Sequence, residues 1–200
     1  MANINKIIEH TKKWEGTLSN ATTDTASKYP SPYIYNGQSG WHTNRGITYA
    51  TFENASKRLG FANNEKNFIY MPDEIWLKIA KNLFWDKLYL DNMKSQALAN
   101  LMFSWTWASG YGWNNRVQRY FTSKNIKWIK NDYKALPINF NALVDKYGEK
   151  KIFDELFEQY KKFYISLNQP ANIKGWLNRA DDLKKFSEAF IIINSPLFFL

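Results

Sequence analysis

The chain has 200 residues, no cysteine and a formal net charge of +9, from 27 basic and 18 acidic side chains. These numbers exclude a disulfide framework, a thiol nucleophile and thiolate metal sites, and two histidines cannot make a histidine-rich metal centre. With 44% hydrophobic residues the chain can bury a substantial core, so a disordered chain is not expected. Any chemistry therefore uses carboxylates, hydroxyls, amides or tyrosine, and no metal, nucleotide or redox cofactor is implied.

The positive charge favours a polyanionic partner, and both nucleic acid and an anionic cell wall fit this description. Only 5 of the 27 basic residues are arginine, the side chain best suited to reading bases and phosphates. We therefore expect no nucleic-acid partner. No apolar run is long enough to predict a membrane span. The N-terminal segment lacks the pattern of a secretory signal, so we expect synthesis in the cytoplasm and a separate export route.

The first part of the chain is expected to be a helix followed by a long loop. Apolar residues at helical spacing predict a helix from Ile4 to about Gly16. Residues 17–46 contain prolines and glycines among serine, threonine and asparagine, which predicts a loop with a short hairpin around Tyr33 to Tyr35. Structureless loops of this length are usually functional, so this loop is the first place to expect site residues.

The rest of the chain reads as helices separated by glycine, proline or polar stretches. Seven to eight helices, with almost no alternating strand pattern, predict an all-α fold. After the loop, the helices are expected at residues 48–59, 72–88, 95–109, 113–121, 140–147, 152–167 and 173–183.

A carboxylate stands beside an indole where the first helix opens into the loop. In this segment, WEGTLSN, Glu15 directly follows Trp14. An indole wall disfavours the charged form of a carboxylate, and a carboxylic acid that stays neutral can protonate a leaving oxygen. The alternative is a surface glutamate at a helix end, because an unpaired glutamate is usually exposed.

A second segment, GQSGWHTNRGIT, places three glycines around Thr43 and Asn44. Glycines permit tight turns and close approach of a ligand, while a hydroxyl and an amide can hold a water or a sugar hydroxyl. The alternative is an ordinary glycine loop that caps the helix starting at Thr48. No Gly-Lys-Ser/Thr follows, so the segment is not a phosphate-binding loop.

These segments resemble the motifs of glycoside hydrolase family 108, a family of lysozyme-like muramidases also described as secretion activator proteins. Their order along residues 5–185 makes the resemblance more specific than any single motif. Glu15-Gly16 with Asn20 is similar to the family motif E-G-G-x-x-N, and the segment 40–48 is similar to G-G-x-T-x-x-G-I-T. The segment 84–88 resembles Y-W-D-x-L, and Ser109-Gly110 with Gln118 resembles N-S-G…L-Q. The segment 175–179 resembles the G-W-x-N-R of a C-terminal peptidoglycan-binding-like domain.

The resemblance implies a lysozyme-like helical bundle that cuts the β-1,4 bond between N-acetylmuramic acid and N-acetylglucosamine in peptidoglycan. Glu15 matches the family's catalytic general acid. The partner would be peptidoglycan glycan strands, met at the cell wall or periplasm after export. The implied regions are a catalytic region at 1–90, a peptidoglycan-binding-like region at 91–190 and an apolar tail at 191–200, through which the chain could dimerise.

The chain departs from the family pattern at the second carboxylate, because its loop is longer than in typical members. Counting forward from Glu15 places that carboxylate at Asp24, and counting back from Thr43 places it at Gln38. With Asp24, a carboxyl separation of about 5 Å would indicate a retaining enzyme and about 6.5 to 9.5 Å an inverting one. With Gln38 the carboxylate is missing, and Thr43 would position the water.

Further side chains are candidates for binding substrate. Trp107 and Trp113 fall off the apolar stripe of their helix and suit a sugar groove, whereas Trp105 fits the stripe and is expected in the core. Asn178 and Arg179 would bind glycan or peptide carboxylates, or would cap and pair structurally. The full set of substrate-binding candidates is Asn20, Gln38, His42, Asn44, Trp107, Trp113, Asn178 and Arg179.

A second hypothesis is a non-catalytic peptidoglycan-binding or secretion-helper protein on the same fold. Ser104 and Ala108 stand where the family usually has an aspartate and an asparagine, and this departure favours the second hypothesis.

Overall fold

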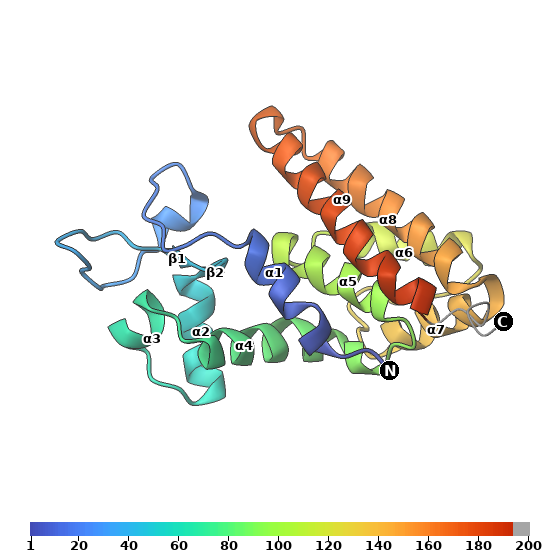
Figure 1. The fold of residues 1–200 in the computed structure, drawn as a ribbon, viewed down its shortest axis with the longest axis horizontal. Helices are drawn as coiled ribbons and strands as arrows, with labels where there is room; N and C mark the ends of the chain where they lie inside the picture. The colour runs from blue at the N-terminus through green and yellow to red at the C-terminus, as the bar shows by residue number, and fades with distance from the viewer. Residues whose placement is uncertain (194–200) are drawn as a thin grey trace. The chain divides into compact units, whose positions relative to one another are not determined.

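The computed structural model describes the backbone of residues 1–193 and the side chains as far as Ile191 (Figure 1). Residues 194–200, most of the expected apolar tail, lie outside the described residues. In the described part the fold is the expected all-α, lysozyme-like helical bundle. Its elements are α1 (Ile8–Trp14), β1 (Thr43–Asn44), β2 (Ile47–Thr48), α2 (Tyr49–Leu59), α3 (Glu65–Ile69), α4 (Asp73–Ala80), α5 (Gln96–Ser109), α6 (Asn114–Ser123), α7 (Ala135–Tyr147), α8 (Glu149–Ser166) and α9 (Pro170–Ile193).

The described residues contain one helix that the sequence pattern did not predict. Helix α3 has only five residues, too few to show a helical period. Asn64 precedes it as the N-cap, and its side chain accepts a hydrogen bond from the Asn67 N–H. Helix α7 begins before the predicted residue 140 because Pro137 lies in its first turn, where proline is tolerated. No helix within residues 1–193 combines the length and apolarity that crossing a membrane would need.

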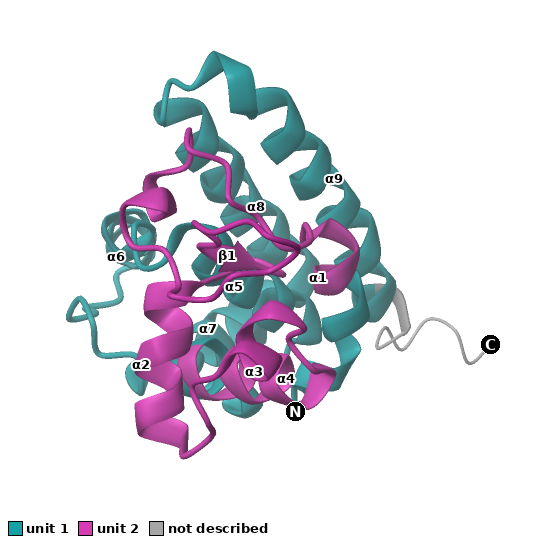
Figure 2. Ribbon diagram, turned by 90° about the vertical axis from the view of Figure 1, so that its left-hand side faces the viewer, with its two compact units in different colours: residues 1–10, 84–200 teal, residues 11–83 magenta. Residues whose placement is uncertain are grey.

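The chain forms two compact units (Figure 2). Unit 2 is Thr11–Leu83, and unit 1 joins Met1–His10 to the chain from Phe84 onward. This division follows the packing of the chain. The expected division at residue 90 into a catalytic and a binding region concerns function and stays a prediction.

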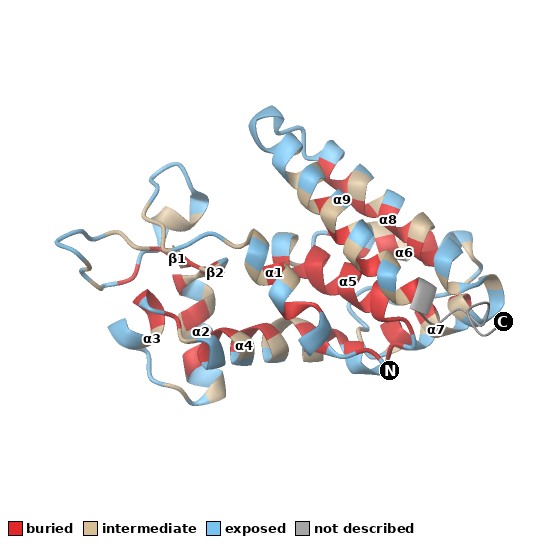
Figure 3. Cartoon of the chain, in the orientation of Figure 1, coloured by how far each residue is buried: buried red, intermediate tan, exposed pale blue. Residues whose placement is uncertain are grey.

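Unit 1 is built around α5. Every residue of α5 from Gln96 to Trp107 is buried (Figure 3), including the polar side chains of Gln96, Asn100, Ser104 and Thr106. Helices α8 and α9 contact each other and α5 (Figure 1). The Trp105 ring lies in this core, edge-on to Tyr160 and Phe163 at centroid distances of 5.3 and 5.7 Å. The prediction that Trp105 is a core residue is confirmed by its complete burial.

Unit 2 packs its helices around aromatic rings and supports a short hairpin. The centroid of the Phe68 ring lies 5.0 Å from that of Tyr49 and 5.2 Å from that of Phe52. Strands β1 and β2 are joined by Arg45 and Gly46, which have φ angles of 49° and 77°. Positive φ at both central residues is the geometry of a tight two-residue hairpin, and glycine supplies it without strain.

The long loop was expected to contain a short hairpin around Tyr33 to Tyr35, and the structure has a tight turn just after it, between Tyr35 and Gln38. Tyr35 and Gln38 exchange backbone hydrogen bonds of 2.9 and 3.0 Å around a turn at Asn36–Gly37. The Tyr33 hydroxyl donates to Asn63 Oδ1 at 2.8 Å, and burial raises the pKa of Tyr33 to about 12. This hydrogen bond anchors the loop to the segment between α2 and α3.

The buried hydrogen bond between Trp113 and Thr106 provides a test of the unit 1 core. Trp113 Nε1 donates to Thr106 Oγ1 at 2.9 Å, and that hydroxyl donates to the Met102 carbonyl at 2.8 Å. We expect Trp113→Phe to lower the free energy of unfolding by about 1–3 kcal/mol, because a buried acceptor loses its donor. Urea denaturation followed by circular dichroism measures this loss.

The matched control is a double-mutant cycle with Thr106→Val. Because the two side chains share one hydrogen bond, the double variant should lose less stability than the sum of the single losses. Strictly additive losses would contradict the stabilising role of this bond.

Candidate functional site

The backbone framework of the candidate site joins the segment after Glu15 to β1. Ser19 forms an antiparallel bridge with Thr43, in which the Ser19 N–H donates to the Thr43 carbonyl at 2.8 Å. Thr43 also pairs with Thr48 of β2, so it lies between two backbone segments. Glu15 is four residues before Ser19, and four residues span at most about 14 Å. The fold therefore keeps Glu15 close to the strand that carries Thr43.

Glu15 begins the loop directly after α1. Its N–H donates to the Lys12 carbonyl at 3.2 Å, which adds one tight turn to the end of the helix. Glu15 and Trp14 are both half-buried, and the Lys13 ammonium lies 5.6 Å from the centre of the Trp14 ring. Glu15 is thus a half-buried carboxyl group at the end of α1, next to Trp14 in the chain.

Asp24 is exposed and has a structural role. Its Oδ1 accepts a hydrogen bond of 2.9 Å from the Ala26 N–H and caps the short 3-10 turn Thr25–Lys28. Its own N–H donates to the Ala21 carbonyl at 3.1 Å. These contacts account for an aspartate at this position without a catalytic role.

Gln38 lies beside the segment that follows Glu15. Asn20 Nδ2 donates to Gln38 Oε1 at 3.4 Å, and Trp41 Nε1 donates to the Gln38 carbonyl at 3.0 Å. The structure therefore brings together two of the expected substrate-binding residues, Asn20 and Gln38. A neutral amide can orient a water or a sugar hydroxyl, but it cannot take the part of a carboxylate.

His42 is completely buried. Its Nδ1 lies 2.9 Å from Thr43 Oγ1, and its Nε2 lies 3.1 Å from the Ala21 carbonyl oxygen. This burial argues against the expected contact between His42 and substrate. Thr43 itself is half-buried, and its hydroxyl forms a hydrogen bond with the imidazole ring of His42.

Asn44 is also buried, with 4% of its surface exposed. Its Nδ2 donates to the Phe68 carbonyl at 2.7 Å and to the Ile69 carbonyl at 2.8 Å. Asn44 therefore ties β1 to the end of α3, and this structural role argues against the expected contact with substrate.

The sequence analysis did not identify an ion-pair cluster that connects α1, the β1–β2 turn and α4. Lys12 Nζ lies 2.8 Å and Arg45 Nη1 2.7 Å from the carboxylate oxygens of Asp73. Hydrogen bonds from Lys12 and Arg45 hold the pKa of Asp73 below its usual value. No local sequence pattern predicts this cluster, because its members are far apart in the chain.

Four expected substrate-binding residues belong to unit 1. Trp113 is completely buried and Trp107 retains 9% exposure, so their burial argues against the expected sugar groove. Both rings pack among aromatic neighbours: Trp107 lies 4.8 Å from Phe84, and Trp113 stacks on Trp128. On α9, by contrast, Asn178 is exposed and Arg179 is half-buried.

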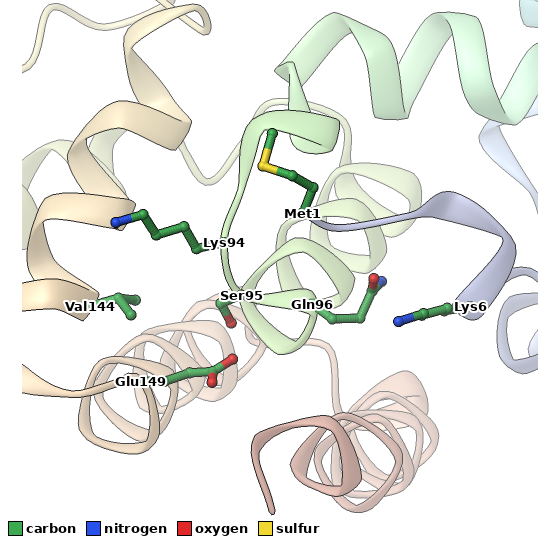
Figure 4. Close-up of a pocket in the computed structure, with 7 residues that line it drawn as sticks. All are labelled: Met1, Lys6, Lys94, Ser95, Gln96, Val144 and Glu149. Carbon is green, nitrogen blue, oxygen red and sulfur yellow. The ribbon is translucent and has the colours of Figure 1, made fainter. Parts of the chain in front are cut away.

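A cavity of about 260 Å³ lies in unit 1 (Figure 4). Its lining includes Lys94, Gln96 and Glu149. Lys94 Nζ lies 2.6 Å from Asp145 Oδ2, and Gln96 Nε2 donates to Asn100 Oδ1 at 2.7 Å. None of the expected site residues lines this cavity, and two of its polar side chains are already held by structural partners.

Asn44→Ala tests the structural role of Asn44. The change removes both donors and leaves two buried carbonyl groups without them, so we expect the free energy of unfolding to fall by about 2–4 kcal/mol. Asn54, an exposed asparagine of α2, gives the matched control. Asn54→Ala should change stability by less than about 0.5 kcal/mol in the same urea titration. Equal stability of the two variants would contradict the structural role.

Comparisons with known proteins agree with this fold. The family model described as Glycosyl hydrolase 108 matches residues 8–110, a range that includes Glu15, Asp24 and Thr43. A solved structure of SagA from Brucella abortus superposes with a TM-score of 0.65, covers 97% of each chain and is 18% identical in sequence, which supports the fold alone. No curated protein gives a significant match. The chain belongs to glycosyl hydrolase family 108.

Proposed function

We propose that this glycoside hydrolase is an N-acetylmuramidase that cleaves the β-1,4 bond between N-acetylmuramic acid and N-acetylglucosamine in peptidoglycan. The family match supports a lysozyme-like enzyme that hydrolyses peptidoglycan. The observation that carries the assignment to residues is the backbone bridge between Ser19 and Thr43, because it holds the segment after Glu15 beside the backbone of Thr43.

In the proposed reaction Glu15 acts as the general acid. It transfers its proton to the glycosidic oxygen while the bond from that oxygen to the anomeric carbon breaks and an oxocarbenium-like state develops. A water then adds its oxygen to the anomeric carbon and releases its extra proton to the solvent. Glu15 is half-buried at the end of α1, a position from which a carboxyl group can reach a bound substrate.

We propose that Thr43 holds the attacking water. Thr43 lies on β1, directly beside the segment that follows Glu15. Asp24 is the alternative, as a carboxylate that would take the proton of the water. Its exposed position and its engagement as a cap favour Thr43.

Unit 1 would contribute to substrate binding. We propose that residues 91–190 form a peptidoglycan-binding-like region and that Asn178 and Arg179 on α9 contact glycan or stem-peptide carboxylates. The net charge of +9 supports attraction to an anionic cell wall. We propose that the protein acts at the cell wall or in the periplasm, where this substrate lies.

The second candidate is a non-catalytic peptidoglycan-binding or secretion-helper protein. The presence of Gln38 beside Asn20 favours it, because one of the two places for the family's second carboxylate then holds a neutral amide.

Glu15→Gln tests hydrolysis against binding. The amide keeps the shape of the side chain but cannot donate the proton, so we expect release of reducing sugar from purified peptidoglycan to fall about 10²- to 10⁴-fold. Binding in a pull-down with insoluble wall should be unchanged. Glu9→Gln, at an exposed glutamate of α1, is the matched control and should retain activity. Wall binding without sugar release by the wild type would instead support the second candidate.

A second pair of variants decides between Thr43 and Asp24. Asparagine caps helical turns as well as aspartate does, so Asp24→Asn removes the charge and leaves the turn intact. Thr43→Val removes the hydroxyl at nearly constant shape. We expect Thr43→Val to lower kcat about 10²-fold and Asp24→Asn to stay close to wild type. The opposite order would assign the role to Asp24.

A further inference from the structure

The proposed reaction does not use His42, although both ring nitrogens of this buried residue have hydrogen-bonding partners. We propose that His42 is a positioning residue that directs the hydroxyl proton of Thr43 away from the attacking water, so that the Thr43 oxygen can only accept from that water. The inference rests on the proposed function, because it concerns the water that Thr43 would hold.

The first step of the argument is the position of the hydrogen on the ring. The partner of Nε2 is the Ala21 carbonyl oxygen, at 3.1 Å, and a carbonyl oxygen only accepts hydrogen bonds. Nε2 must therefore carry the hydrogen. In the neutral ring the other nitrogen, Nδ1, then carries none and can only accept.

The second step is the direction of the hydrogen bond to Thr43. Nδ1 lies 2.9 Å from Thr43 Oγ1, and the only hydrogen available between these atoms belongs to the hydroxyl. Thr43 therefore donates its single proton to His42. Its remaining hydrogen-bonding capacity consists of oxygen lone pairs, which accept.

The third step is the consequence for a bound water. A water next to Thr43 must donate one of its own hydrogens to Oγ1, which leaves the lone pairs of the water available for attack on the anomeric carbon. If the hydroxyl proton pointed at the water instead, it would occupy one of those lone pairs. The tautomer of His42 thus determines whether the water is oriented for attack.

The fourth step is that the surrounding backbone holds His42 in place. Its N–H donates to the Ser19 carbonyl at 3.0 Å, and its carbonyl accepts from the Tyr49 N–H at 2.7 Å. The Ala21 carbonyl also accepts from the Asp24 N–H, so His42 and the turn at Asp24 share one acceptor. With backbone and ring both engaged, the imidazole has one orientation.

Two substitutions separate positioning from a purely structural role. In His42→Asn, the amide oxygen lies at the same bond distance from the backbone as Nδ1, so it can accept from Thr43 while the bond to Ala21 is lost. In His42→Gln, the amide nitrogen corresponds to Nε2, so it can donate to Ala21 while the acceptor for Thr43 is lost. Each variant therefore keeps one of the two hydrogen bonds.

We expect the two variants to rank in opposite order for activity and for stability. On purified peptidoglycan, His42→Gln should lower kcat by about tenfold to 10²-fold with little change in KM, because the water is held but misoriented. His42→Asn should retain more of the wild-type kcat while having the lower melting temperature. If kcat follows melting temperature in both variants, His42 is only structural and the inference is overturned.

A spectroscopic measurement on the wild type keeps the test independent of folding and activity. Two-bond 15N–1H correlations of the histidine ring should show the Nε2–H tautomer for His42, and a hydrogen on Nδ1 would overturn the inference. If the wild type releases no sugar, the proposed function fails. The tautomer still decides the direction of the Thr43 hydroxyl in that case, so the two failures are distinguishable.

Discussion

The backbone bridge between Ser19 and Thr43 is the constraint on which the candidate site depends. Residues 17–42 contain no α-helix, so their position relies on individual hydrogen bonds. The 2.8 Å hydrogen bond from the Ser19 N–H to the Thr43 carbonyl holds the segment after Glu15 against β1. The pairing of β1 with β2 holds β1 in place. A general acid must come within hydrogen-bond reach of the substrate atom that it protonates, so a site built on a loop needs backbone bonds that keep the loop in one position.

Several polar side chains of the loop hold the loop together. Asp24 caps a turn and His42 connects Ala21 to Thr43, while Tyr33 reaches Asn63. A buried polar group without a hydrogen-bonding partner lowers the stability of the fold. A loop with little regular structure therefore uses its own side chains to form these hydrogen bonds. These structural roles explain why residue type alone is a poor guide to function here.

The sequence was sufficient to predict the fold class, because the helical spacing of apolar residues is a local property of the chain. It also identified the segments around Glu15 and Thr43, which the structure joins through Ser19. The roles of Asn44 and Trp113 could not be predicted. The partners of Asn44 are 24 and 25 residues away, and Trp113 is buried by rings such as Trp128 that no helical period relates to it. Contacts of this kind are determined by tertiary packing.

The burial of α5 from Gln96 to Trp107 also bears on the motions of unit 1. Backbone amides in a helix enclosed on every side exchange their hydrogens with water only when the surrounding unit opens as a whole, whereas amides in loops exchange through small local openings. Helix α5 should therefore contain the slowest-exchanging amides of unit 1, and the rate at which they exchange reports the global opening of that unit.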